Sequence, residues 1–156
     1  MSLLILVLTL LFSVADRNSI AGGDFDRMKA LAGEWEATTP EGKTQITFRV
    51  ISGGSAVMES MTNGNMVTIY HPDGESVLMT HYCEAGNQPR MRAQKAAADG
   101  SIAFQFVDVA NVKSTGEGRM HRLVIRILDR DHVTEDWTWK EGNNETTSRF
   151  ELKRVK

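Results

Sequence analysis

Cysteine and proline are scarce in this chain of 156 residues, which contains one cysteine and three prolines. The lone cysteine, Cys83, cannot form an intrachain disulfide. The fold must therefore depend on a hydrophobic core, and a domain of about 140 residues is long enough to bury one. Paired cysteines, a His-x-x-x-His pair and a glycine-rich phosphate loop are all missing from the sequence. It therefore predicts neither a metal site nor a nucleotide site.

An excess of positive charge is missing as well. The 18 Lys and Arg residues are balanced by 20 Asp and Glu, which gives a formal net charge of −2 at pH 7. Proteins that bind nucleic acids need clustered basic residues to neutralise the phosphates. We therefore expect no nucleic-acid partner.

A hydrophobic run long enough to cross a membrane as a helix is also missing. The apolar stretch Leu3–Ala15 is shorter than the roughly 20 residues that such a helix needs. Its length and its small residues at Ser13-Val14-Ala15 are typical of a signal peptide, although no Lys or Arg precedes it. An uncleaved anchor or a misassigned start is the alternative.

The predicted organisation follows from that assignment. We predict a signal peptide over residues 1–15, a flexible lead-in over 16–23, and one domain over 24–156. The protein is then exported, either to the periplasm or out of the cell, with no membrane attachment after cleavage.

One short helical pattern is followed by many short alternating patterns. Asp24–Ala32 has apolar residues at helical spacing, with Asp24 as its cap and Gly33 at its end. After Gly33 the apolar residues recur at every second position, as in half-buried strands. The predicted strands are Glu34–Thr39, Thr44–Ile51, Ser55–Met61, Met66–His71, Ser76–Cys83, Arg90–Ala96, Ile102–Val107, Met120–Leu128, His132–Lys140 and Thr146–Lys153.

The breaks between these strands have the composition of tight turns, as in Asn63-Gly64 and Pro72-Asp73-Gly74. Tight turns join antiparallel neighbours, and the sequence has no helical crossover that a parallel sheet would need. We therefore predict an all-β fold, an antiparallel up-and-down barrel of about ten strands, with the short N-terminal helix closing one end near Trp35.

A resemblance supports this fold. Gly33-Glu34-Trp35 is similar to the Gly-x-Trp with which lipocalins and fatty-acid-binding proteins begin, where the tryptophan closes one end of the barrel. Segments from nearly the whole mature chain together resemble a bacterial family of unknown function with calycin-like barrels. These segments are Phe25–Trp35, Tyr70–Gly74, Thr80–Cys83, Asn87–Met91, Met120–Arg122 and Trp137–Trp139. The resemblance implies a calycin-like fold and brings no established activity.

Alternation predicts which side chains face the interior. His121 shares a face with Leu123 and Ile125, as a ligand contact or as a hydrogen-bonded core residue. Both faces of the strand that ends at Cys83 are mostly apolar, so either His81 or Tyr82 faces the cavity. The predicted ligand-binding residues are His81, Tyr82, Arg90, His121, Glu135, Trp137 and Trp139.

Three functions are compatible with these residues. The first is a barrel that binds a small, partly apolar molecule, because a barrel of about ten strands is wide enough to hold one. The alternative is an enzyme of the same fold that uses inward His and Glu groups, such as His121 and Glu135, as acid and base. The third is haem binding, as in nitrobindin-type barrels. Those barrels keep their iron-binding histidine near the C-terminal strand, and Thr146–Lys153 has no histidine, so we expect no cofactor. The sequence specifies no oligomeric state.

Overall fold

The computed structural model describes residues 20–61, 66–95, 97–114 and 116–155. One helix precedes ten strands, and a short 3-10 turn, η1 (Ser52–Gly54), follows the second strand. The elements are α1 (Ile20–Lys29), β1 (Gly33–Thr39), β2 (Gly42–Ile51), β3 (Ala56–Met61), β4 (Val67–Asp73), β5 (Ser76–Tyr82), β6 (Gln88–Ala93), β7 (Ile102–Ala110), β8 (Arg119–Ile127), β9 (His132–Glu141) and β10 (Asn144–Arg154).

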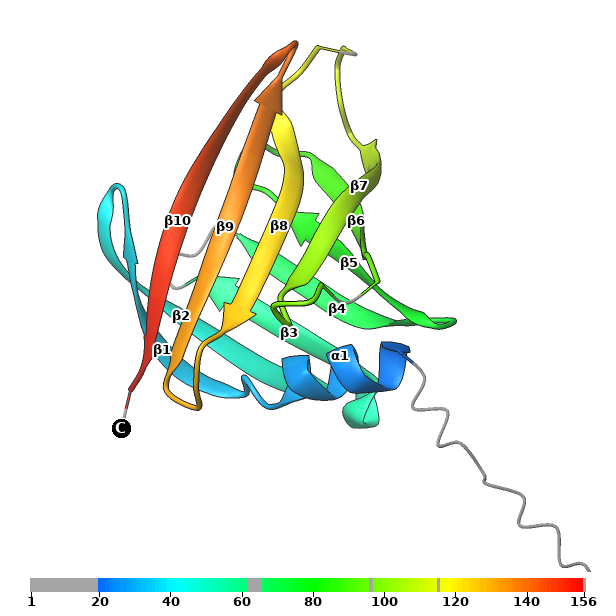
Figure 1. Cartoon of the computed structure of the whole chain (residues 1–156). Helices are drawn as coiled ribbons and strands as arrows, with labels where there is room; N and C mark the ends of the chain where they lie inside the picture. The colour runs from blue at the N-terminus through cyan, green and yellow to red at the C-terminus, as the bar shows by residue number, and fades with distance from the viewer. Residues whose placement is uncertain (1–19, 62–65, 96, 115, 156) are drawn as a thin grey trace, which may run out of the picture.

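The ten strands form a closed antiparallel barrel (Figure 1). Each strand pairs with the next along the chain, and β10 pairs with β1 through Trp35 and Arg154, which closes the sheet. Closure leaves no unpaired strand edge, which is how an all-β protein without disulfides avoids edge-to-edge association. The predicted up-and-down barrel is confirmed.

Two β-bulges interrupt the regular pairing. In one, the extra residue is Val107 of β7, which lies opposite the step from Arg90 to Met91 on β6. In the other, the extra residue is His121 of β8, between Met120 and Arg122. An extra residue in one strand reverses the side-chain alternation beyond it. Both bulges therefore change which residues face the barrel interior.

The helix α1 closes one end of the barrel, as predicted, and lies below the strands in Figure 1. Met28 and Leu31 are buried in the core beside Trp35, whose indole N–H donates a hydrogen bond of 2.9 Å to the Leu31 carbonyl. The Arg154 guanidinium lies 4.2 Å from the Trp35 ring and covers it from the other side. Trp35 on the first strand thus contacts both the segment after the helix, through Leu31, and the last strand, through Arg154.

The bounds of the helix differ from the prediction. It already includes Ile20, so Asp24 lies inside the helix and is not its cap. Asp24 instead forms an ion pair of 3.2 Å with Arg27, one turn further along. Residues 20–23, which were predicted to be a flexible lead-in, are helical, whereas the predicted signal peptide over residues 1–15 lies outside the described residues. Within the described part of the chain, no helix is long and apolar enough to span a membrane.

The structure resolves the ambiguous face of β5. Val77, Met79 and His81 are buried inside the barrel, whereas Tyr82 is 49% exposed on the outside. The outer face of this strand also has apolar residues, and it is covered only in part, because Leu78 and Thr80 are half-buried. His81 is therefore the residue that this strand contributes to the interior.

Candidate ligand-binding site

The barrel holds two adjoining cavities. The larger one, the mouth cavity, has a volume of about 440 Å³ and reaches the β1–β2 hairpin, which Figure 1 shows away from α1. It is lined by Thr39, Glu41, Gly42, Lys43, Thr44, Met61, Met66, Glu84, Met120, Trp137, Ser148 and Phe150.

The smaller one, the inner cavity, has a volume of about 20 Å³, roughly the room of one water molecule. Its lining residues are Glu59, Met61, Met66, Thr68, His81, Met120, Trp137 and Phe150. The two cavities share Met61, Met66, Met120, Trp137 and Phe150, so the inner cavity lies directly behind the mouth cavity.

Sheet register brings the polar residues of the inner cavity together. Glu59 on β3 pairs with Thr68 on β4, and Thr68 pairs with His81 on β5. All three are buried. Directly opposite residues on neighbouring strands point to the same side of the sheet, so the three side chains form one row on the inner wall.

Glu59 is a buried acid with one hydrogen bond to a neighbouring strand. The Tyr70 hydroxyl donates to its Oε2 atom at 2.6 Å. Burial raises the pKa of Glu59 from 4.5 to about 7, and the bond from Tyr70 opposes part of that rise. Near neutral pH, this carboxyl group is therefore present in both its neutral and its charged form.

His81 is a buried neutral imidazole. Its Nδ1 atom lies 2.9 Å from the Thr68 hydroxyl, whereas its Nε2 atom is buried and has no hydrogen-bond partner. Burial lowers the pKa of His81 from 6.5 to about 4. Its ring lies 4.9 Å from that of Trp137, which comes from β9 on the far wall of the barrel.

Glu135 is the second buried acid and is completely shielded from solvent. Its Oε2 atom accepts a hydrogen bond of 3.0 Å from the Trp137 indole N–H, and its Oε1 atom has no partner. Burial raises the pKa of Glu135 well above its ordinary value, and the charge of Glu59 raises it further. Glu135 therefore holds its proton more tightly than an ordinary carboxyl group, and it lies close enough to Glu59 for the two acids to influence each other.

Two of the predicted ligand-binding residues, His81 and Trp137, line the inner cavity, and a third, Glu135, is hydrogen-bonded to Trp137. Trp139, on the same strand, is half-buried and lines neither cavity. Its ring lies so close to Gly118 that a Cβ atom there would approach it to 2.2 Å. Trp139 is thus a packing element between β9 and the segment before β8.

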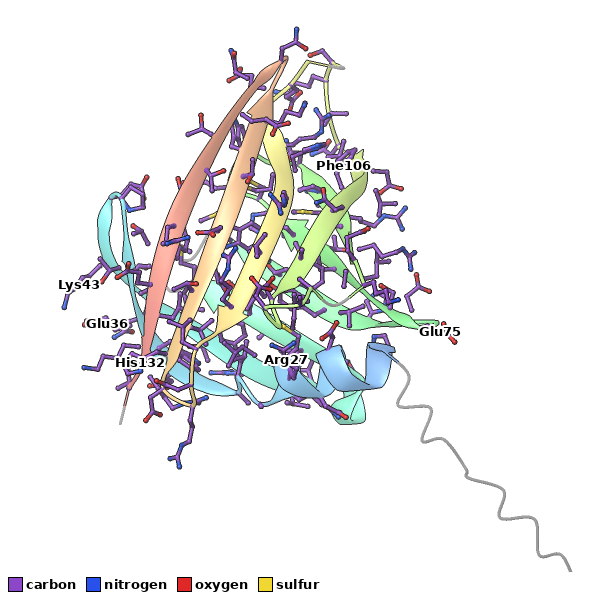
Figure 2. The ribbon with its side chains drawn as sticks, in the orientation of Figure 1. Arg27, Glu36, Lys43, Glu75, Phe106 and His132 are labelled. Carbon is purple, nitrogen blue, oxygen red and sulfur yellow. The ribbon has the colours of Figure 1, made fainter. Side chains whose placement is uncertain are left out.

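His121 does not share a face with Leu123, contrary to the alternation. The bulge makes Met120 the partner of Trp139 and leaves His121 as the extra residue. Its ring is half-buried and lies 5.1 Å from the ring of Phe106, which Figure 2 shows far from Arg27 of the helix. Strict alternation predicted the inward face correctly only for the part of β8 beyond the bulge.

Tyr82 and Arg90 lie outside the barrel. The Tyr82 side chain is exposed, and the Arg90 guanidinium makes a two-point ion pair with Asp108 on the outer surface of β7. Regular alternation on β6 explains the outward placement of Arg90, because Pro89, Met91 and Ala93 are the buried residues of this strand.

Glu59, Thr68 and Tyr70 were missing from the predicted site. The alternation that identified the other inward-facing residues also indicates these three. Glu59 lies between Val57 and Met61 on one face of its predicted strand, and Tyr70 shares a face with Thr68. A carboxylate on an otherwise apolar face is an indication of a buried polar network.

The inner cavity has no fixed positive charge among the described residues that line it. At the mouth cavity, Lys43 is the single basic residue, and it forms an ion pair of 2.7 Å with Glu36. Among the described residues, no group of three or more His, Cys, Asp or Glu side chains is arranged to hold a metal ion. The site therefore consists of acids, a neutral imidazole, methionines and aromatic rings.

No protein-family model matches the chain, and no curated protein matches it either.

Proposed function

We propose that this protein is a calycin-like barrel that binds a small, partly apolar molecule. The observation that carries the proposal is the inner cavity, which is lined by the buried residues Glu59, His81 and Trp137 and adjoins the larger mouth cavity. The tail of the ligand occupies the mouth cavity, among methionines and Phe150, and its polar end reaches the inner cavity.

A purely structural role does not account for this arrangement. An unpaired polar atom in a protein interior costs about 1–3 kcal/mol, and His81 and Glu135 each have one such atom. Apolar residues of similar size would fill the same space without that cost. Polar groups that converge on an apolar cavity are typical of a ligand site.

Native mass spectrometry of the protein purified from its own host tests the proposal. We expect an added mass that is lost on denaturation. Met61→Trp places a large ring where the two cavities meet and should abolish the added mass. Leu128→Trp is the matched control, because Leu128 is 63% exposed outside the barrel. Equal ligand retention in both variants would exclude this cavity as the binding site.

A second candidate function is an enzyme that uses acid–base catalysis. The observation in its favour is Glu59, whose pKa of about 7 suits proton transfer near neutral pH. The pair suggested by the sequence, His121 and Glu135, is not favoured, because His121 contacts Phe106 and Glu135 binds Trp137. Conversion of a retained ligand that stops in Glu59→Gln would establish the enzymatic function.

Haem does not fit the residues of the inner cavity. An axial histidine needs open space beside its free nitrogen. The Nε2 atom of His81 is buried, the cavity that this residue lines is about 20 Å³, and the Trp137 ring lies 4.9 Å from the imidazole. We therefore rank haem third, after ligand binding and catalysis.

We further propose membership of the bacterial calycin-like family that the sequence resembles, and export by the signal peptide. The closed antiparallel barrel of ten strands supports the first of these proposals at the level of fold.

A further inference from the structure

A chain of hydrogen bonds links the polar residues around the inner cavity. The Tyr70 hydroxyl donates its proton to Glu59 Oε2 at 2.6 Å. The Thr68 hydroxyl lies 2.9 Å from His81 Nδ1. Both hydroxyl groups therefore already have partners within the protein.

His81 uses its Nδ1 atom in this chain, and its Nε2 atom is buried without a partner. Burial lowers the pKa of His81 to about 4, so the ring is neutral near pH 7 and adds no positive charge to the inner cavity.

The hydrogen-bond donors of Tyr70 and Trp137 already have acceptors within the protein, because Tyr70 donates to Glu59 and the Trp137 N–H donates to Glu135. Glu135 is not among the residues that line the inner cavity, whereas Glu59 lines it. The cavity therefore presents the carboxyl group of Glu59 as an acceptor, and a ligand that complements this site must supply a hydrogen-bond donor.

We propose that the inner cavity binds the ammonium head group of a primary amine whose apolar tail lies in the mouth cavity. This inference rests on the proposed ligand-binding function. An ammonium group carries three N–H donors and one positive charge, and it is about as large as a water molecule, which matches the volume of about 20 Å³. The Trp137 ring adds an aromatic face to the site, and such a face attracts a cation.

Charge separates this ligand class from fatty acids. A carboxylate head group would face Glu59 without a fixed cation among the described residues that line the inner cavity, and like charges in a buried site repel. A bound ammonium instead stabilises the charged form of Glu59. Where Glu59 is protonated before binding, its proton leaves for the buffer as the ammonium–carboxylate pair forms.

The ionisable groups around Glu59 are consistent with this proton release. Tyr70 on β4, His81 on β5 and Glu135 on β9 face it, and its partner on β2 is the apolar Phe48. Burial raises the pKa values of Tyr70 and Glu135, which favours their neutral forms, and it lowers the pKa of His81 to about 4, which leaves its ring neutral near pH 7. Glu59 is therefore the group that changes its charge when the amine binds near neutral pH.

Isothermal titration calorimetry of the full chain with n-octylamine, 1-octanol and octanoate tests the inference, because the three probes share a tail and differ in the head group. We expect octylamine to bind at least tenfold more tightly than octanol, and octanoate to bind most weakly. Titrations at pH 7 in buffers of different ionisation enthalpy should show proton release with octylamine only.

Glu59→Gln keeps the shape of the side chain and removes its charge. It should weaken octylamine binding at least tenfold, abolish proton release, and change octanol binding less than twofold. Glu151→Gln is the matched control, because it removes an acid from the exposed part of β10. It should leave the preference for the amine intact.

The outcomes separate the two proposals. Equal binding of octylamine and octanol by the unmodified protein, without proton release, would overturn the amine site and leave the binding barrel standing. This comparison needs no variant, so it holds even if Glu59→Gln does not fold. If none of the three probes binds and no ligand is retained by protein from its host, both proposals fail.

Discussion

The imidazole of His81 and the indole of Trp137 lie 4.9 Å apart although they come from β5 and β9, which are not neighbours in the sheet. The contact therefore crosses the interior and joins opposite walls of the barrel. Both rings line the inner cavity, which adjoins the mouth cavity. The buried core contains a second ring contact, in which the centroids of Tyr70 and Phe104 lie 5.6 Å apart. Any ligand that enters the mouth cavity must meet Trp137.

Trp137→Phe should reduce both ligand-induced fluorescence quenching and stability. The tryptophan lines both cavities, and its N–H is the donor to the buried Oε2 atom of Glu135. Without that donor the carboxyl group loses its partner, which should lower the free energy of unfolding by about 1–3 kcal/mol. Titration with an apolar fluorophore and urea unfolding measure the two effects. Trp139→Phe, which lines neither cavity, should preserve most of the quenching, and equal losses in both variants would contradict the assignment.

The stability of the barrel should respond to pH through Glu59. Its pKa rises from 4.5 to about 7 on folding, so the folded state holds this proton more tightly than the unfolded state. The contribution of Glu59 therefore becomes less favourable as pH rises from about 4.5 to about 7, by about 3 kcal/mol in total. Glu59→Gln still accepts the bond from Tyr70 and should be more stable than the unmodified protein at pH 8. Urea unfolding at pH 5 and pH 8 measures the difference, and a variant that loses stability equally at both would contradict it.

His81 should give the opposite pH dependence. Its pKa falls from 6.5 to about 4 on folding, so stability is lost as pH falls through that interval. Between about pH 4.5 and 6.5 the contributions of His81 and Glu59 oppose each other and partly cancel. His81→Gln should therefore expose a steeper loss of stability with rising pH in this window. Unfolding curves at half-unit intervals from pH 4.5 to 7 test this, and an unchanged slope would show that His81 titrates normally.

Arg154 should contribute more to stability than its position near the C-terminus suggests. Its guanidinium donates to the carbonyl groups of Ala30, Ala32 and Arg130, and it covers the ring of Trp35. Because hydrogen bonds from a charged donor contribute more than neutral ones, Arg154→Met should lower the free energy of unfolding by about 2–3 kcal/mol. Arg149→Met breaks only an exposed pair with Asp136 and should cost less than about 1 kcal/mol. Similar costs for the two variants, measured by thermal unfolding, would show that Arg154 does not anchor the helix.

The sequence predicts the fold well because turn composition and two-residue alternation are local properties. They identified the strands, the closed antiparallel arrangement and the helix beside Trp35. The hairpin between β8 and β9 illustrates both the success and its limit. Counting outward from a turn centred on Arg130 pairs Ile125 with Glu135, as observed, but it pairs His121 with Trp139, where the structure has Met120. A bulge depends on packing around it and has no reliable local signal.

The candidate site was only partly predictable for a related reason. Alternation places Glu135 and Trp137 inside because β9 is regular over that stretch. It does not reveal that Glu59 lies near them, because that proximity arises from the curvature of the barrel and joins residues far apart in the chain. The free nitrogen of His81 is likewise a property of the hydrogen-bond chain through Thr68 and Tyr70, which exists only after three strands have paired.

Export predicts a specific mature chain. If residues 1–15 are a signal peptide, the intact mass of the protein isolated from the periplasm or medium should lack Met1–Ala15. The described helix begins with Ile20, so cleavage near Ala15 leaves it intact. An exported protein that retains Met1 by mass spectrometry would contradict the signal-peptide assignment.

Haem should not form a stoichiometric complex with this barrel. His81 faces the inner cavity, but the Trp137 ring and a volume of about 20 Å³ exclude a macrocycle beside its Nε2 atom. The ring of His121 lies against Phe106 and lines neither cavity. Titration with haemin should therefore give no sharp Soret shift that saturates at one equivalent. Any weak absorbance change should be the same in His81→Ala and His121→Ala, because adsorption to the apolar mouth cavity needs no axial ligand. A saturating Soret band that disappears in His81→Ala would show that Trp137 moves aside for haem, and it would place haem binding ahead of the amine site.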